Sequence, residues 1–180
     1  MSGRDAEGTL LTRLWATWRM KYIRSIGEPT DGCIFCTLLE EEDGPGNLVL
    51  HRGDTCFVVL NLYPYNNGHM MVVPKRHVSE FGEFSSKEAS EVMELAALMQ
   101  RVLDSTHQPH GFNLGMNLGR VAGAGIPDHL HLHLVPRWTG DTNFMPVTAE
   151  TKVLPEALEA TWSRIREGVI AELEKKEGAE

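Results

Sequence analysis

A run of alternating histidines and leucines, His129-Leu130-His131-Leu132-His133-Leu134-Val135, restricts the fold more than any other segment. Because successive side chains point to opposite faces of a β-strand, the run predicts a strand from His129 to Pro136 with leucines on one face and histidines on the other. Histidines two apart on a strand are about 7 Å apart at their Cα atoms, which is close enough for one pocket. The leucine face needs a core, so the chain must supply further strands and covering helices.

Three interpretations of this histidine face are open. It could be the polar side of a half-exposed strand, although histidine has no special fitness for that position. It could chelate a metal by itself, because His-x-His spacing suits a chelate. The interpretation we favour is catalytic: one neutral imidazole is a nucleophile whose tautomer a hydrogen bond fixes, and its neighbours hold phosphate oxygens or assist the leaving group.

Further segments have the periodicities of helices and strands. Ser85 and Glu88 form a capping-box pattern that opens a central helix, and apolar residues continue at helical spacing to Leu103. The same spacing predicts an opening helix over residues 11–22 and a closing helix that starts near Pro155. Strand patterns are present at residues 47–52, 56–62, 69–73 and 112–118.

Short turns between most of these strands favour antiparallel pairing. We therefore predict an α+β fold in which an antiparallel sheet carries a packed central helix and has further helices at its N- and C-terminal ends.

Composition limits the partners of this chain. Its 180 residues, 42% hydrophobic and 23% charged, suit one domain with a proper core. The net charge of −8 should repel nucleic-acid backbones and anionic membranes, and no apolar run has the length of a membrane span. The start of the sequence has no secretory apolar stretch. We expect a soluble, cytoplasmic protein that binds a small molecule, with neither a nucleic acid nor a membrane as partner.

The three cysteines do not indicate a disulfide framework, because their number is odd and no export signal is present. Cys33 and Cys36 are separated by two residues, a gap that lets both thiolates reach one tetrahedral ion. A redox pair would instead be expected beside a parallel βαβ unit, which the pattern does not show. The spacing therefore favours zinc.

Several segments together resemble the histidine-triad family, whose signature alternates three histidines with apolar residues. The likeness extends from about Cys33 to Asp141 and includes the stretch from Asn61 to Pro74 and Pro136-Arg137-Trp138 after the triad. Residues 138–144 and the N-terminal Leu14-Trp15 are similar to the bacterial branch that contains diadenosine tetraphosphate phosphorylases. The resemblance implies a helical extension at residues 1–32, a nucleotide-binding catalytic domain at 33–145 and a C-terminal helix at 146–180.

By this resemblance, His131 attacks the α-phosphate of a dinucleoside polyphosphate and forms a covalent nucleotidyl-histidine. His133 and His69 contact phosphate or hold the triad in place. The residues expected to contact the nucleotide are Asn61, Asn117, Gly123 and Gly125. For the two asparagines, ordinary turn chemistry is the competing interpretation.

The resemblance also implies the remaining zinc ligands. His77 follows Pro-Lys-x and His129 opens the triad, and both match the ligand positions of zinc-bearing members, with His51 as a competing donor. Four protein ligands would close the coordination sphere and make the ion structural.

The acceptor of the nucleotidyl group is left open between water and inorganic phosphate. Many members of the family carry Gln and then Ser or Thr before the triad, whereas residues 124–128 of this chain read Ala-Gly-Ile-Pro-Asp. A nucleoside phosphoramidate is the alternative substrate, and a zinc-stabilised nucleotide-binding module is the non-catalytic alternative. Magnesium could accompany the polyphosphate, and the family resemblance implies a homodimer or larger assembly.

Overall fold

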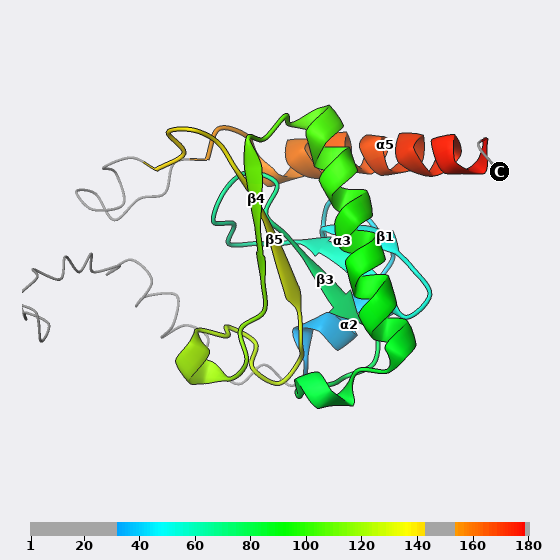
Figure 1. Cartoon of the computed structure of the whole chain (residues 1–180), viewed down its shortest axis with the longest axis vertical. Coiled ribbons are helices and arrows are strands. Elements are labelled where there is room, and N and C mark those ends of the chain that lie inside the picture. Colours follow the sequence, from blue (N-terminus) through cyan, green and yellow to red (C-terminus); the bar gives the residue numbers. More distant parts are fainter. Residues whose placement is uncertain (1–31, 143–153, 179–180) are drawn as a thin grey trace, which may run out of the picture.

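Five antiparallel strands form one sheet in the order β1-β2-β3-β5-β4 (Figure 1). The structure is a computed structural model that describes residues 32–142 and 154–178. The strands are β1 (Val49–Arg52), β2 (Cys56–Leu60), β3 (Met70–Pro74), β4 (Gly111–Gly115) and β5 (Leu132–Arg137). The helices are α2 (Ile34–Glu40), η1 (Phe81–Glu83), α3 (Ser86–Thr106), η2 (Arg120–Ala122) and α5 (Leu158–Glu177). The predicted α+β fold is confirmed, and the helix expected over 11–22 lies outside the described residues.

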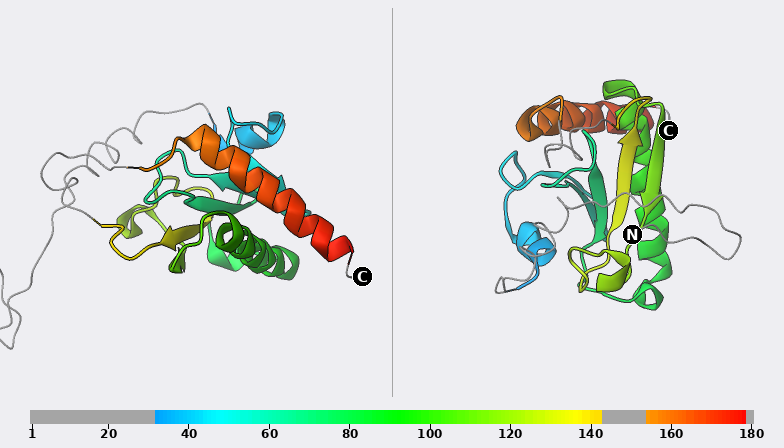
Figure 2. Two further views of the ribbon diagram at one scale, coloured as in Figure 1. Left: turned by 90° about the horizontal axis from the view of Figure 1, so that it is seen from above. Right: turned by 90° about the vertical axis from the view of Figure 1, so that its left-hand side faces the viewer.

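Helix α3 covers one face of the sheet, as Figure 2 shows from two sides. It begins at the predicted capping box: Ser85 accepts the Glu88 N–H, and the Glu88 carboxylate accepts the Ser85 N–H. Its buried side chains, among them Met99 and Leu103, pack against β2 and β3, in which every residue is buried. Burial on both faces explains why β2 and β3 are apolar throughout and do not alternate.

Helix α5 crosses α3 and closes the far end of the core (Figure 1). Its Ile165 and Val169 are fully buried. The two helices approach most closely at Gly168, where an added Cβ would lie 2.8 Å from Thr106 and 2.9 Å from Val102. A larger residue at this position would therefore push the helices apart.

The same helix binds the edge strand of the sheet. Trp162 Nε1 donates to the carbonyl of Val49 and Arg166 Nη1 to that of Leu50, each at 2.8 Å. Because these carbonyls belong to the edge strand β1, the two bonds cover polar groups that have no strand partner on that side. Among the described residues, no helix has both the length and the apolar character that crossing a membrane requires.

Several boundaries differ from the sequence expectation; β4, for example, ends at Gly115 and not at residue 118. Helix α5 begins at Leu158, later than expected, and β5 begins at Leu132 and not at His129. The carbonyl of His129 accepts a hydrogen bond from the ring of His131 at 2.8 Å, and Leu130 N–H donates to Val78 O at 2.7 Å. These bonds draw the first two residues of the run away from the sheet ladder.

Glu91 fixes the turn between β1 and β2 to α3. Its carboxylate accepts the backbone N–H groups of Asp54 (2.5 Å) and Thr55 (2.6 Å), and also the Thr55 hydroxyl.

We expect Glu91→Gln to lower the free energy of unfolding by about 1–3 kcal/mol. The reason is that one carboxylate oxygen is replaced by an amide NH2 group, which would face the N–H groups that the oxygen accepted. Urea denaturation measures this, with the exposed Glu94→Gln on the same helix as the control. A loss of equal size in both variants would contradict the assignment.

Candidate active site and metal site

The ring of His131 is held by the main chain. Its Nδ1–H donates to the carbonyl oxygen of His129 at 2.8 Å, which leaves the lone pair on Nε2. The residue is 4% exposed and its ring centroid lies 5.3 Å from that of Phe35. Burial lowers the pKa of His131, so the ring is neutral at neutral pH. A neutral imidazole with a fixed tautomer has the form that a nucleophile requires.

His69 orients His133 through a chain of hydrogen bonds. The Tyr65 N–H donates to His69 Nδ1 at 3.0 Å, so the neutral ring carries its hydrogen on Nε2. That Nε2 lies 3.0 Å from His133 Nδ1, which therefore accepts, and His133 carries its own hydrogen on Nε2. Burial, with a smaller contribution from His133, lowers the pKa of His69 to about 3. His69 is fully buried and contacts His133, which fits the predicted role of holding the triad better than a direct contact with phosphate.

Tyr65 forms an aromatic wall over these two histidines. Its ring centroid lies 4.5 Å from that of His69, and it stacks on His133 at 6.0 Å with 24° between the ring planes. The side chain is partly exposed and lines a cavity of about 470 Å³ next to His133. In the sequence Tyr65 is only part of a turn, so its site role had no local signal.

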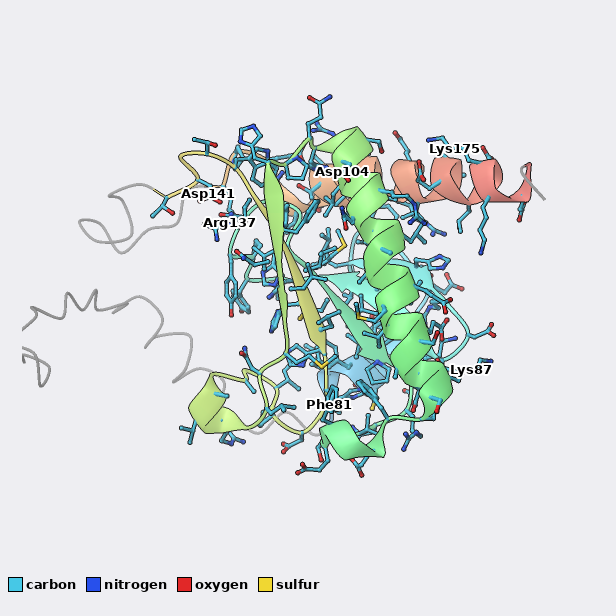
Figure 3. The ribbon with its side chains drawn as sticks, in the orientation of Figure 1. Phe81, Lys87, Asp104, Arg137, Asp141 and Lys175 are labelled. Atoms are coloured by element: carbon cyan, nitrogen blue, oxygen red, sulfur yellow. The ribbon has the colours of Figure 1, made fainter. Side chains whose placement is uncertain are left out.

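The cavity beside His133 is polar and nearly neutral. Asn113, Asn117 and Arg137 line it. The Arg137 guanidinium binds both oxygens of Asp141, at 2.6 and 3.0 Å, and donates to Asn113 Oδ1 at 2.6 Å. Figure 3 shows Arg137 and Asp141 together at the end of β5. The predicted residue Asn117 therefore lies in the same cavity as His133.

The other residues predicted to bind nucleotide lie around this cavity without lining it. Asn61 is 8% exposed; its Oδ1 accepts the Tyr63 N–H at 2.9 Å and its Nδ2 is 3.4 Å from His69 Nδ1. This is turn chemistry that supports His69, and a contact of Asn61 with ribose stays a prediction. Gly123 and Gly125 are in the half-buried loop before the triad. The left-handed φ of Gly123, +93°, explains the glycine at that position.

Four predicted ligands converge on one point. Donor atoms of Cys33, Cys36, His77 and His129 all lie within 4.8 Å of one another. Cys33 Sγ is 3.2 Å from His129 Nδ1, and Cys36 Sγ is 3.4 Å from His77 Nδ1. His129 uses Nε2–H to bind the carbonyl of Pro74 at 2.9 Å, which turns Nδ1 toward the thiols. Two sulfur and two nitrogen donors at these separations fit a tetrahedral ion.

Two competing assignments of ligands do not fit the geometry. His51 lies on β1 and is outside the cluster. Within the described parts of the chain, the histidine ladder forms no metal group of its own, because the cluster includes His129 but neither His131 nor His133.

Helix α2, which carries the cysteines, had no prediction from the sequence. Its N-cap is Cys33, which makes no side-chain capping bond. Arg52, which is distant in sequence, donates to the carbonyls of Leu38 and Leu39 at 2.9 and 3.0 Å and so satisfies the end of the helix. Phe35, between the two cysteines, packs edge-on against His129 at 5.3 Å.

The fold thus brings the three histidines of the triad together with a polar cavity and a Cys–His cluster. The HIT domain model matches residues 44–140, more than half of the sequence, and the chain belongs to the HIT family. A relative named AP-4-A phosphorylase, from Mycobacterium tuberculosis, is 42% identical over 160 residues, which cover 84% of this chain and 80% of the relative.

Solved structures share the fold. A histidine triad nucleotide-binding protein from Sulfolobus tokodaii, 26% identical, superposes with a TM-score of 0.62 over 77% of this chain and 93% of its own. A zinc-bound histidine triad family protein from Mycobacterium smegmatis, 20% identical, gives a TM-score of 0.64 over 81% and 97% of the two chains.

The low pKa of His69 makes the stability of the protein depend on pH. In the unfolded state the His69 ring has a pKa near its ordinary value of about 6.5, so it is protonated below that pH. In the folded state the pKa is about 3, so the ring stays neutral down to about pH 3. Stability is therefore lost as the pH falls through this window. His69 should account for about 2 kcal/mol of the loss between about pH 7 and about pH 5.

Urea unfolding of wild type and His69→Asn at both pH values measures this contribution. The variant should lose less stability than wild type on acidification, because asparagine does not titrate. Equal losses would show that His69 is not the group responsible.

Proposed function

We propose that the protein transfers a nucleotidyl group from a dinucleoside polyphosphate, through a covalent intermediate on His131. The observation that carries the proposal is the tautomer of His131, whose Nδ1–H is bound to a main-chain carbonyl and whose lone pair is on Nε2. The enzyme class, a HIT-type nucleotide hydrolase or phosphorylase, is supported by family membership and by the relative named AP-4-A phosphorylase.

In the first step Nε2 of His131 attacks the α-phosphorus. A P–N bond forms and the anhydride P–O bond breaks, so the remaining nucleotide leaves as an anion that needs no proton. The positive charge that develops on the ring is stabilised by the carbonyl of His129, which accepts Nδ1–H. His133 Nε2–H donates to a phosphate oxygen from the position that His69 gives it.

In the second step an acceptor attacks phosphorus and the P–N bond breaks, which restores neutral His131. Inorganic phosphate as acceptor releases a nucleoside diphosphate, and water releases a nucleoside monophosphate. The relative's name favours phosphate, and adenine as the base. Magnesium enters only as a counter-ion of the substrate, since the cluster at Cys33 is the one metal group among the described residues.

The intermediate can be trapped. Mixing with diadenosine tetraphosphate, followed by alkaline quench, should add the mass of one adenylate to the intact protein, and acid should remove it, because phosphoramidates are acid-labile. His131→Ala should show no adduct and a kcat reduced by roughly 10³-fold or more.

Two comparisons complete this experiment. ADP as a product with phosphate present establishes phosphorolysis, and AMP establishes hydrolysis. Product formation without an adduct would refute the histidine intermediate, and binding without either would favour the nucleotide-binding module. Faster turnover of adenosine 5′-phosphoramidate would favour the alternative substrate.

We also propose that the Cys–His cluster binds one structural zinc ion. The mixed sulfur and nitrogen donors suit zinc, and four protein ligands leave no position for a reacting water. The ion would bind His129 and Cys33 together, and so hold α2 against the segment that carries His131. A homodimer or larger assembly and a cytoplasmic location stay predictions from the sequence.

Zinc content tests this assignment. Purified wild-type protein should contain about one zinc per chain, and Cys36→Ser should lose most of it and melt at a lower temperature. Cys56→Ala is the matched control, since Cys56 is the third cysteine, is buried in β2 and lies outside the cluster. Elemental analysis and thermal melting provide both readouts; an equal zinc content in all three proteins would exclude the site.

A further inference from the structure

A second cavity lies next to the first, at the end of β5 and beside the start of α5. Its volume is about 690 Å³, larger than the cavity at His133. The two cavities share Asn66 and Asp141 in their walls, so this pair of residues lies between them. None of the residues predicted to act in catalysis or to bind the metal lines the second cavity.

The residues between the two cavities form a fixed ridge. Asn66 Nδ2 donates to Asp141 Oδ2 at 2.7 Å and to the carbonyl of Pro136 at 3.0 Å. The same carboxylate oxygen accepts the Trp138 N–H at 3.2 Å, and Arg137 binds it at 2.6 Å. Because Asp141 binds Asn66, Arg137 and the Trp138 N–H, these hydrogen bonds fix the backbone at Trp138.

The lining of the second cavity has the chemistry of a nucleobase site. Trp138 offers an indole ring, and Arg164 is a cation on α5 that is about half exposed. Neutral hydrogen-bonding groups complete the wall: Asn67, Thr106, Gln108 and Thr139. Bases stack on aromatic rings and guanidinium groups, and amides and hydroxyls bind their polar edges.

The inner wall is polar and not fully satisfied. The side chain of His107 is 4% exposed, and its Nε2 is buried without a hydrogen-bond partner in the described structure, 3.6 Å from Glu156. Glu156 is bound by Arg164 at 2.5 Å and by the Thr161 hydroxyl at 2.8 Å. Such polar and charged groups are not typical of a closed apolar interface between α3 and α5, so this part of the molecule is not simply core packing.

The two cavities are neighbours at the end of β5. Trp138 comes directly after this strand, five residues beyond His133. A polyphosphate that reacts at the triad must extend its second nucleoside away from His131, and the second cavity adjoins the first at Asn66 and Asp141.

We propose that this second cavity binds the distal nucleobase of the dinucleoside polyphosphate, the one that departs with the leaving group. The proposal rests on the proposed function, because it assumes a substrate with two nucleosides. Trp138 stacks on the base and Arg164 lies beside its phosphate or ring. The site thereby distinguishes a dinucleoside polyphosphate from a nucleotide with the same phosphate chain and one base.

Binding measurements test this without requiring turnover. In the His131→Ala background, calorimetry gives the Kd of diadenosine tetraphosphate and of adenosine 5′-tetraphosphate, which lacks the second nucleoside. Adding Trp138→Ala should raise the ratio of the first Kd to the second about tenfold, the effect of losing one stacked base. Trp138→Phe keeps a ring and should raise it less. Phe81→Ala, at an aromatic side chain that is 60% exposed and distant from both cavities, is the control and should leave the ratio unchanged.

The outcomes are separable. An unchanged ratio in Trp138→Ala, or an equal loss of affinity for both ligands, overturns the distal site even if the adenylate adduct forms. A ratio that changes as expected while wild type forms neither adduct nor products supports the distal site and refutes the proposed reaction. Thermal melting of each variant shows whether a loss arises from misfolding; if Trp138→Ala is unfolded, Trp138→Phe and Arg164→Gln decide, and unchanged ratios in both overturn the site.

Discussion

Hydrogen bonds with the main chain set the tautomers of three histidines in this site, and the rest of the arrangement depends on them. His131 donates to the carbonyl of His129, His129 donates to the carbonyl of Pro74, and His69 accepts the N–H of Tyr65. Each bond decides which ring nitrogen carries the hydrogen. A backbone group cannot be removed by changing a side chain, so these tautomers are as durable as the sheet. The register that pairs Met71 with His133 also brings β3 and β5 together, so that the ring of His69 reaches that of His133.

Helix α2 links the Cys–His cluster to His131. Phe35, between Cys33 and Cys36, contacts the rings of both His129 and His131. The two-residue gap between the cysteines therefore also places an apolar ring against His131, the proposed nucleophile. Desolvation by such neighbours is the first cause of the lowered pKa of His131. Under the proposed function, a structural metal site would therefore contribute to the environment of His131 although it leaves no position for a reacting water.

Local patterns predicted much of this structure, and long-range contacts account for the rest. The alternation of histidine and leucine, the capping box at Ser85 and the spacing of Cys33 and Cys36 are local, and each is found where expected. Leu130, Leu132 and Leu134 are buried as predicted. Helix α2 had no local signal because its end is satisfied by Arg52, from a different element. The turn around Tyr65 and the ridge at Asp141 depend on contacts with distant parts of the chain, and no local spacing in the sequence predicts such contacts.

The neutrality of the cavity at His133 has a consequence for how long a ligand stays. Arg137 is the one guanidinium or ammonium among the described residues that line it, and Asp141 already balances that charge. The proposed polyphosphate would meet amides, main-chain groups and the ring of His133 there. Such donors orient an anion but do not retain it as unpaired cations would. Under the proposed function we therefore expect a short residence, so that departure of the spent nucleotide would not limit the catalytic cycle.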